Sequence, residues 1–131
     1  MSSDEELVDA ARAAREQAWA PMSGYRVGAA LRDADGRIWT GCNVEHVVLP
    51  ETVCAEKTAI VKAVSEGARR FPVAAVFTDS EPPATPCGSC RQMLHAWGVE
   101  VVWVASPRGV RRFTLNELLP AAFALDLGKS T

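Results

Sequence analysis

Residues 52–64 read TVCAEKTAIVKAV, and they open a stretch of the chain in which predicted helices and strands alternate. The alanines and spaced aliphatic residues of this segment predict a helix that ends near Gly67. The short apolar run VAAVFT at 73–78 predicts a buried strand, CGSCRQMLHAW at 87–97 a second helix, and VEVVWVA at 99–105 another buried strand. Strands that are joined through helices pair in parallel, so this stretch predicts an α/β fold.

The segments outside this stretch extend the predicted sheet. Strand-like segments at 25–32 and 37–44 flank the turn DADG at 33–36. An Asp-Gly pair favours a tight hairpin, so these two strands are expected to be antiparallel and the sheet mixed, with helices on both faces. The remaining predicted elements are a helix that starts at Ser3 with Glu6 at capping-box spacing and is ended by Pro21, and a last helix at 114–123, interrupted at Pro120.

The composition is that of a mildly acidic globular protein. The 131 residues carry a formal net charge of -2, which argues against a nucleic-acid partner because domains that bind nucleic acid are usually strongly basic. The length predicts a single domain over 1–131. The sequence has no apolar run long enough to span a bilayer, and its acidic start lacks the features of a signal peptide. We therefore expect a cytoplasmic location and no membrane partner.

Four cysteines in a cytoplasmic chain indicate metal binding or catalysis rather than disulfides. Cys87 and Cys90 form a C-x-x-C unit at the start of one predicted helix, and Cys54 opens another. Three thiolates from two helix starts could bind zinc and leave the fourth position for water, as in catalytic sites. Two alternatives are a redox pair at the C-x-x-C unit and a closed structural site completed by Cys42. Cys42 lies inside a predicted strand, where a buried thiol of the core is the simpler interpretation.

The residues beside these cysteines suit an open zinc site. Glu56 lies two positions after Cys54 and could move protons between water and a leaving group. Because three thiolates would leave the site anionic, positive charge is needed near it. The N-terminal N–H groups of the two helices could supply this charge, together with Lys57 and Arg91 behind the ligands. The alternative for both cations is an ordinary position on a helix surface.

The motifs CAE at 54–56 and PCGSC at 86–90 match a zinc deaminase signature, and the chain resembles the small cytidine deaminases over nearly its whole length. Together the matching segments are far more specific than a lone C-x-x-C unit. They are APMS (20–23), YRVGAAL (25–31), GCNVE (41–45), CAEKTAI (54–60), VSEG (64–67), PCGSCRQ (86–92) and LLPAAF (118–123).

The resemblance implies a three-layer α/β/α sandwich with a mixed five-stranded sheet, one Zn2+ per chain, and a homotetramer with shared active sites. It implies that the zinc ligands are Cys54, Cys87 and Cys90 and that the proton shuttle is Glu56. It implies substrate contacts from Tyr25, Asn43, Glu45, Ala55 and Phe123, the last reaching the pocket of a neighbouring subunit. Residues two apart on a strand share a face, which agrees with a joint role of Asn43 and Glu45 at the ribose.

The chain departs from the family's pattern around the expected pocket. Where typical members continue with NASYGL, this chain has HVVLPE at 46–51, so His46 replaces an amide and a proline replaces a glycine. Lys57 stands in place of the usual arginine, Met22 in place of a tyrosine, and Tyr25 in place of a phenylalanine. These changes leave the proposed ligands intact but alter the wall of the pocket. His46 is therefore an additional candidate for substrate contact.

The sequence thus predicts a zinc-dependent aminohydrolase that converts cytidine and/or deoxycytidine to a uridine-type nucleoside and ammonia, as in pyrimidine salvage. Glu56 would take a proton from water, deliver it to N3 of the pyrimidine, and finally protonate the departing amino group. The altered segment at 46–51 keeps open a second hypothesis, a deaminase of another aminopyrimidine nucleoside such as a blasticidin-type antibiotic. A third is a non-catalytic, zinc-stabilised binding module, against which the intact Glu56 argues.

Overall fold

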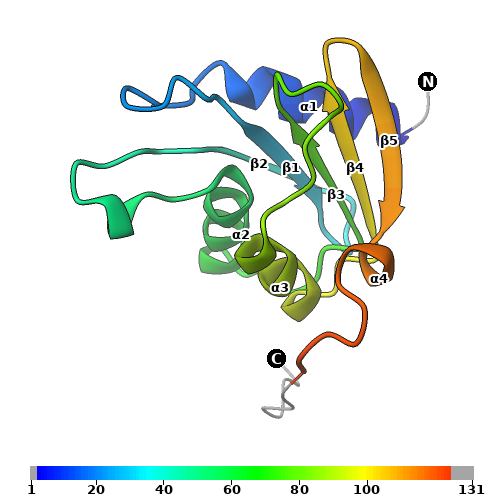
Figure 1. Ribbon diagram of the computed structural model, residues 1–131. Coiled ribbons are helices and arrows are strands. Elements are labelled where there is room, and N and C mark those ends of the chain that lie inside the picture. Colours follow the sequence, from blue (N-terminus) through cyan, green and yellow to red (C-terminus); the bar gives the residue numbers. More distant parts are fainter. Residues whose placement is uncertain (1–2, 125–131) are drawn as a thin grey trace.

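The computed structural model describes residues 3–124, and a five-stranded mixed sheet with strand order β2-β1-β3-β4-β5 lies at its centre (Figure 1). β3 and β4 are parallel, whereas the other neighbours in the sheet pair antiparallel. The parallel pair results from the crossover through α3, as expected for strands joined by a helix. The strands are β1 (Gly28–Arg32), β2 (Ile38–Cys42), β3 (Val73–Phe77), β4 (Val101–Ser106) and β5 (Gly109–Thr114).

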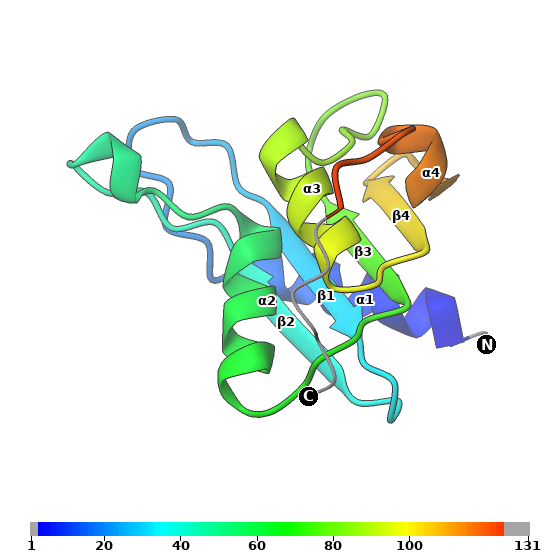
Figure 2. The same cartoon turned by 90° about the horizontal axis from the view of Figure 1, so that it is seen from below.

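Helices cover both faces of this sheet, which confirms the expected three-layer α/β/α arrangement. α1 (Ser3–Arg15) packs on one face. α2 (Ala55–Ser65) and α3 (Gly88–Ala96) lie next to each other on the opposite face (Figures 1 and 2). A short 3-10 turn, η1 (Leu49–Glu51), precedes α2, and the four-residue helix α4 (Leu115–Leu118) follows β5.

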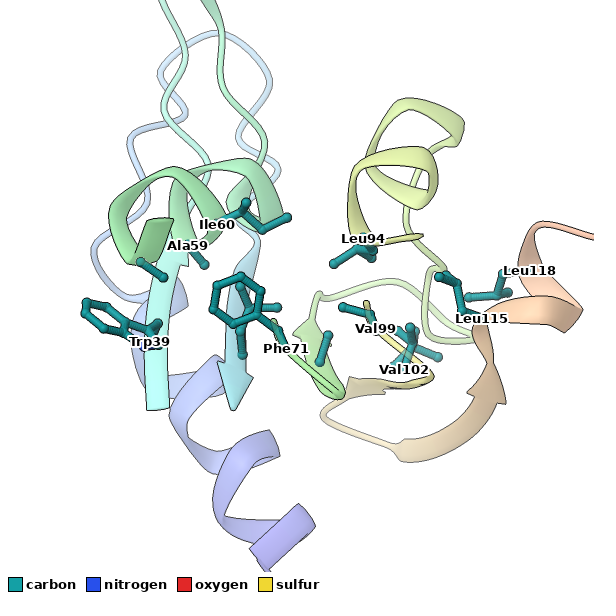
Figure 3. Packing of buried hydrophobic residues seen from close by; sticks show 13 residues of the cluster. Trp39, Ala59, Ile60, Phe71, Leu94, Val99, Val102, Leu115 and Leu118 are labelled. Atoms are coloured by element: carbon teal, nitrogen blue, oxygen red, sulfur yellow. The ribbon is translucent and has the colours of Figure 1, made fainter. Parts of the chain in front are cut away.

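Two apolar clusters join the layers. The larger lies between the sheet and the α2/α3 layer, and its side chains come from strands, helices and the loop residue Phe71, which is fully buried (Figure 3). The smaller cluster is built around Leu7 and Ala11 of α1 and the facing residues of the sheet. Burial on both faces explains why the central strand β3 reads as a continuous apolar run, without the alternation of a half-exposed strand.

Two glycines permit close approach of the helices to the sheet. A Cβ atom built on Gly41 of β2 would lie 2.5 Å from the backbone nitrogen of Ala59 and 2.7 Å from the carbonyl oxygen of Ala55, both in α2. A Cβ atom on Gly28 of β1 would lie 1.9 Å from the carbonyl oxygen of Ala11 in α1. The spacing between the layers is therefore set by backbone contact at these two positions.

The predicted hairpin is present, and Asp33 organises its turn. Its carboxylate accepts hydrogen bonds from the backbone N–H groups of Asp35 and Arg37 and from the indole N–H of Trp39 at 2.9 Å. Desolvation acts to raise the pKa of Asp33, but these hydrogen bonds outweigh it and the pKa is lowered. Gly36 adopts a φ of +91°, which a residue with a side chain would adopt only with strain.

Several predicted boundaries were wrong at the ends of the chain. The first helix ends at Arg15, well before Pro21, because the chain leaves the helix to pair with the extension of β2, where the N–H of Trp19 donates to the carbonyl of Asn43. The predicted last helix at 114–123 shrinks to α4, which Thr114 caps.

Strand β5 was not predicted from the residues themselves, although the family resemblance implied five strands. β5 is an edge strand of the sheet and pairs with β4 on one side. Three successive residues, 110–112, are exposed, so the segment lacks the apolar pattern of the buried strands. Its structure depends on backbone hydrogen bonds to β4, which residue type does not reveal.

Candidate metal centre and active site

Three cysteines converge where α2 and α3 begin. Cys54 immediately precedes α2, Cys87 immediately precedes α3, and Cys90 lies in the first turn of α3. Their sulfur atoms all lie within 4.8 Å of one another. Three thiolates are a donor set suited to zinc, and the two helix N-termini offset their negative charge. The geometry of the chain therefore fits a Zn2+ ion held by three residues, with a position left for water or substrate.

Cys42 is not part of this cluster. It lies on β2 as a free thiol, as predicted, but it is half-buried, so the expectation that it is buried in the core was wrong. Among residues 3–124, the cluster of potential metal ligands contains three cysteines and no fourth, which gives the closed four-cysteine alternative no support. The difference matters because a catalytic zinc site needs an open position.

Glu56 is the buried acid of the site. It stands in the first turn of α2, and its side chain is only 5% exposed. Burial, together with the nearby Cys54 thiolate, raises its pKa to about 7, although hydrogen bonds and Lys57 act in the other direction. A carboxyl group with a pKa near neutrality can both accept and donate a proton under ordinary conditions, which is the requirement for a proton shuttle.

The thiol groups of Cys54 and Cys90 influence each other. The thiol of Cys90 hydrogen-bonds to Cys54, and this contact, helped by the charge of Lys57, lowers the pKa of Cys54 to about 6. The same hydrogen bond and burial raise the pKa of Cys90. The shared hydrogen bond therefore favours the thiolate within this pair, and a thiolate is the form that binds metal.

A cavity of about 250 Å3 opens beside the thiols and Glu56. It brings together seven of the predicted site residues: Tyr25, Asn43, Cys54, Ala55, Glu56, Cys87 and Cys90. The rest of its wall was not anticipated from the sequence, and comes from Val27, Thr52, Val53, Val76, Thr78, Ala84, Thr85 and Pro86. Thr78 could have been found, because it directly follows the buried strand β3, and the carboxyl ends of such strands are common places for ligand sites.

The side chains of Asn43 and Glu45 are held by different hydrogen-bond partners. The side chain of Asn43 accepts a hydrogen bond from the N–H of Val27 at 2.8 Å and donates one to the carbonyl of Tyr25 at 2.7 Å, which fixes the amide at the cavity wall. Glu45 faces a neighbouring hollow. Its carboxylate accepts hydrogen bonds from the hydroxyl and backbone N–H of Ser23 and from the N–H of Met22, and the contact with the Ser23 hydroxyl is the first cause of its lowered pKa.

Tyr25 joins two sides of the cavity. Its ring lines the wall, and its hydroxyl group lies 2.7 Å from the hydroxyl of Ser80 in the loop between β3 and α3. The hydroxyl is the atom that distinguishes this residue from the phenylalanine usual in the family. The departure from the family's pattern therefore adds a tie between the segment before β1 and the loop that leads to Cys87.

Besides Glu45, four predicted residues do not line this cavity within the chain. His46 is exposed, and its Nδ1 accepts a hydrogen bond from the N–H of Val48 at 3.0 Å. Phe123 is 69% exposed. Lys57 affects the site through its charge, as described above. The guanidinium group of Arg91 is engaged with oxygen atoms of residues 85, 86 and 118.

In this α/β/α sandwich, three thiols and one buried carboxyl group meet at the starts of two helices. This combination is characteristic of the zinc deaminases as a class. The family model of the cytidine and deoxycytidylate deaminase zinc-binding region matches residues 1–106. The chain belongs to this family, and zinc is its cofactor.

Named relatives agree with this assignment. A cytidine deaminase of Sporosarcina psychrophila is 44% identical over 125 residues, covering 93% of this chain and 92% of the relative. The crystal structure of cytidine deaminase from Burkholderia pseudomallei superposes with a TM-score of 0.88 at 41% identity, covering 94% of this chain and all of the other. That from Mycobacterium tuberculosis gives a TM-score of 0.81 at 36% identity, covering 95% of this chain and all of the other.

Proposed function

We propose that this enzyme hydrolyses the amino group of cytidine and/or deoxycytidine and releases the uridine-type nucleoside and ammonia. The observation that carries the proposal is the buried carboxyl group of Glu56 beside the Cys54, Cys87 and Cys90 thiols, in a chain that is 44% identical to a named cytidine deaminase. The reaction consumes one water and replaces the amino group at C4 of the pyrimidine by oxygen.

Glu56 carries the protons in this proposal. When bound to the three thiolates, zinc lowers the pKa of water and so supplies the nucleophile for hydrolysis. Glu56 accepts one proton of the attacking water and passes it to N3 of the pyrimidine. It then takes the second proton of that water, from the hydroxyl now on C4, and delivers it to the amino group as the bond from C4 to nitrogen breaks and ammonia leaves. A group whose pKa is about 7 can take both roles within one turnover, because neither protonation state is costly to reach.

The cavity wall would orient the nucleoside. Asn43 lies at the wall with its amide fixed by the backbone, so its remaining hydrogen-bonding capacity can meet a sugar hydroxyl. Glu45 adds a carboxylate in the neighbouring hollow, where we place the far side of the ribose. The aromatic ring of Tyr25 and the backbone of Ala55 complete the contacts that we assign to the substrate, and His46 stays a candidate at the rim.

We propose a homotetramer with shared active sites. Apolar side chains gather at the surface on 19–25 and 44–49, where Trp19 is 62% exposed, Val47 86% and Leu49 67%. Exposed apolar groups in such number are typical of interaction surfaces. Phe123 is also exposed, and a second copy of the chain would give it a pocket to enter. Phe123→Ala is expected to raise KM, with the mass measured by sedimentation as the control for assembly.

The remaining expectations concern where the enzyme works. We propose a single-domain cytoplasmic enzyme of pyrimidine salvage that acts on free nucleosides, with no nucleic-acid or membrane partner. The net charge of -2 supports the choice of free nucleosides. Within residues 3–124, none of the helices combines the length and the apolar character that a membrane span requires.

A substrate panel tests the proposal. Zinc-loaded protein is incubated with cytidine, deoxycytidine and other aminopyrimidine nucleosides, including a blasticidin-type antibiotic, and ammonia release is measured beside the Glu56→Gln variant. Turnover of cytidine or deoxycytidine that is lost in the variant is the expected result. Turnover of another aminopyrimidine alone would replace the substrate, and no turnover at all would favour a non-catalytic, zinc-stabilised binding module.

A further inference from the structure

The side chain of Arg91 joins three segments of the chain. Its Nε donates to the carbonyl oxygen of Pro86 at 2.7 Å, and its two terminal nitrogens donate to the hydroxyl of Thr85 at 2.7 Å and to the carbonyl oxygen of Leu118 at 2.6 Å. The residue is partly buried and stands directly after the ligand Cys90 in α3. Each of the three nitrogens of its planar fork thus donates one hydrogen bond to this set of acceptors.

Two of these acceptors belong to the wall of the catalytic cavity. Thr85 and Pro86 line the cavity together with Cys87, the ligand that follows them. Thr85 and Pro86 lie in a loop, since α3 begins only at Gly88. Their positions are therefore not fixed by membership of a strand or helix. Arg91 connects this loop to the C-terminal end of α4, where Leu118 is buried.

We propose that Arg91 is a positioning residue of the active site, which acts through Thr85 and Pro86 to hold the cavity wall beside the metal ligands. This inference rests on the proposed deaminase activity. The alternative role for this cation is electrostatic, the neutralisation of the thiolates.

The shape of the side chain distinguishes the two roles. Lysine keeps the positive charge but has a single nitrogen at its end, so it cannot reach three acceptors in the plane of a guanidinium fork. If Arg91 acts by position, Arg91→Lys and Arg91→Gln are impaired alike. If it acts by neutralising the thiolates, the lysine variant behaves like the wild type, whereas the glutamine variant loses zinc.

The experiment measures kcat and KM on cytidine, zinc content and amide hydrogen exchange for both variants. We expect kcat/KM per bound zinc to fall by roughly 10- to 100-fold in each, because displacement of about 1 Å at a reacting centre has effects of that order. One zinc per chain is expected to remain. Amide exchange should become faster in 84–88 and 116–119 and stay unchanged in α1. A general loss of stability would not produce this local pattern.

Controls keep the test decisive. Arg12→Gln removes an arginine whose exposed side chain bonds to Asp9 on α1, and it should match the wild type. Thr85→Val removes one acceptor without changing the shape of the side chain, and should give a smaller loss in the same direction if the Arg91 variants fail to fold. Full activity in Arg91→Lys, or unchanged exchange at 84–88 in both variants, would overturn the proposal. The exchange and zinc measurements are independent of the substrate.

Discussion

Replacing Gly41 by alanine is expected to displace the helix that carries Glu56. The new Cβ atom would lie 2.5 Å from the backbone nitrogen of Ala59, about 0.9 Å short of the 3.4 Å at which ordinary contact begins. Backbone atoms cannot rotate away as a side chain can. The whole of α2 must therefore move from the sheet by nearly 1 Å, and Cys54 and Glu56 at its start move with it.

This displacement should lower both the stability of the protein and its catalytic efficiency. Overfilling a packed core costs about 1–3 kcal/mol of unfolding free energy. At roughly 4 °C for each kcal/mol in a domain of this size, Tm should fall by about 4–12 °C. A displacement of nearly 1 Å at catalytic groups should lower kcat/KM by as much as ~100-fold in the protein that remains folded. The activity of Gly41→Ala should therefore fall far more than its folded fraction.

Gly28→Ala is the matched control for this prediction. Its Cβ atom would lie 1.9 Å from the carbonyl oxygen of Ala11, so the loss of Tm should be at least as large. The clash moves α1, however, on the face of the sheet opposite to Glu56. Thermal unfolding followed by circular dichroism and kcat/KM normalised to bound zinc would separate the two effects. A Gly41→Ala protein with wild-type kcat/KM would refute the argument that α2 rests on the sheet by backbone contact.

Three further predictions concern single groups. Tyr25→Phe removes the hydroxyl that hydrogen-bonds to Ser80, and it should raise KM by about two- to fivefold with little change in kcat. Ser80→Ala should have the same effect. The double variant should show no further increase in KM beyond that of either single variant. The pKa of Asp33 is lower in the folded chain than its unfolded value of 3.8, so this group stabilises the fold at pH values above 3.8. The contribution is lost as the pH falls through the pKa of the folded state. The advantage of the wild type over Asp33→Asn in urea unfolding should therefore shrink on acidification from pH 5, and a constant difference would contradict it. Cys42→Ser should retain one zinc per chain in a colorimetric assay while Cys87→Ser loses it, and loss of zinc in the first would restore the four-cysteine alternative.

The interior elements were predictable because each has a strong local pattern. The buried strand β3 reads as an apolar run, and the turn at 33–36 contains the Asp-Gly pair that hairpins favour. The edge strand β5 and the true end of α1 were missed. In both places the conformation depends on pairing with another segment. β5 pairs with β4, which directly precedes it, and the chain after α1 pairs with the extension of β2, and neither pairing leaves a periodic signal.

The sequence by itself determined the chemistry of this enzyme. The motifs at Cys54, Glu56, Cys87 and Cys90, with the family resemblance that they carry, predicted a zinc donor set and an acid beside it, because ligand chemistry depends on residue type and local spacing. The tertiary structure alone decided what Arg91 touches. Its three acceptors come from a loop and from a helix 27 residues away, and only the folded chain brings them within reach of one guanidinium group. Side-chain contacts between distant segments are set by packing, which a single sequence does not display.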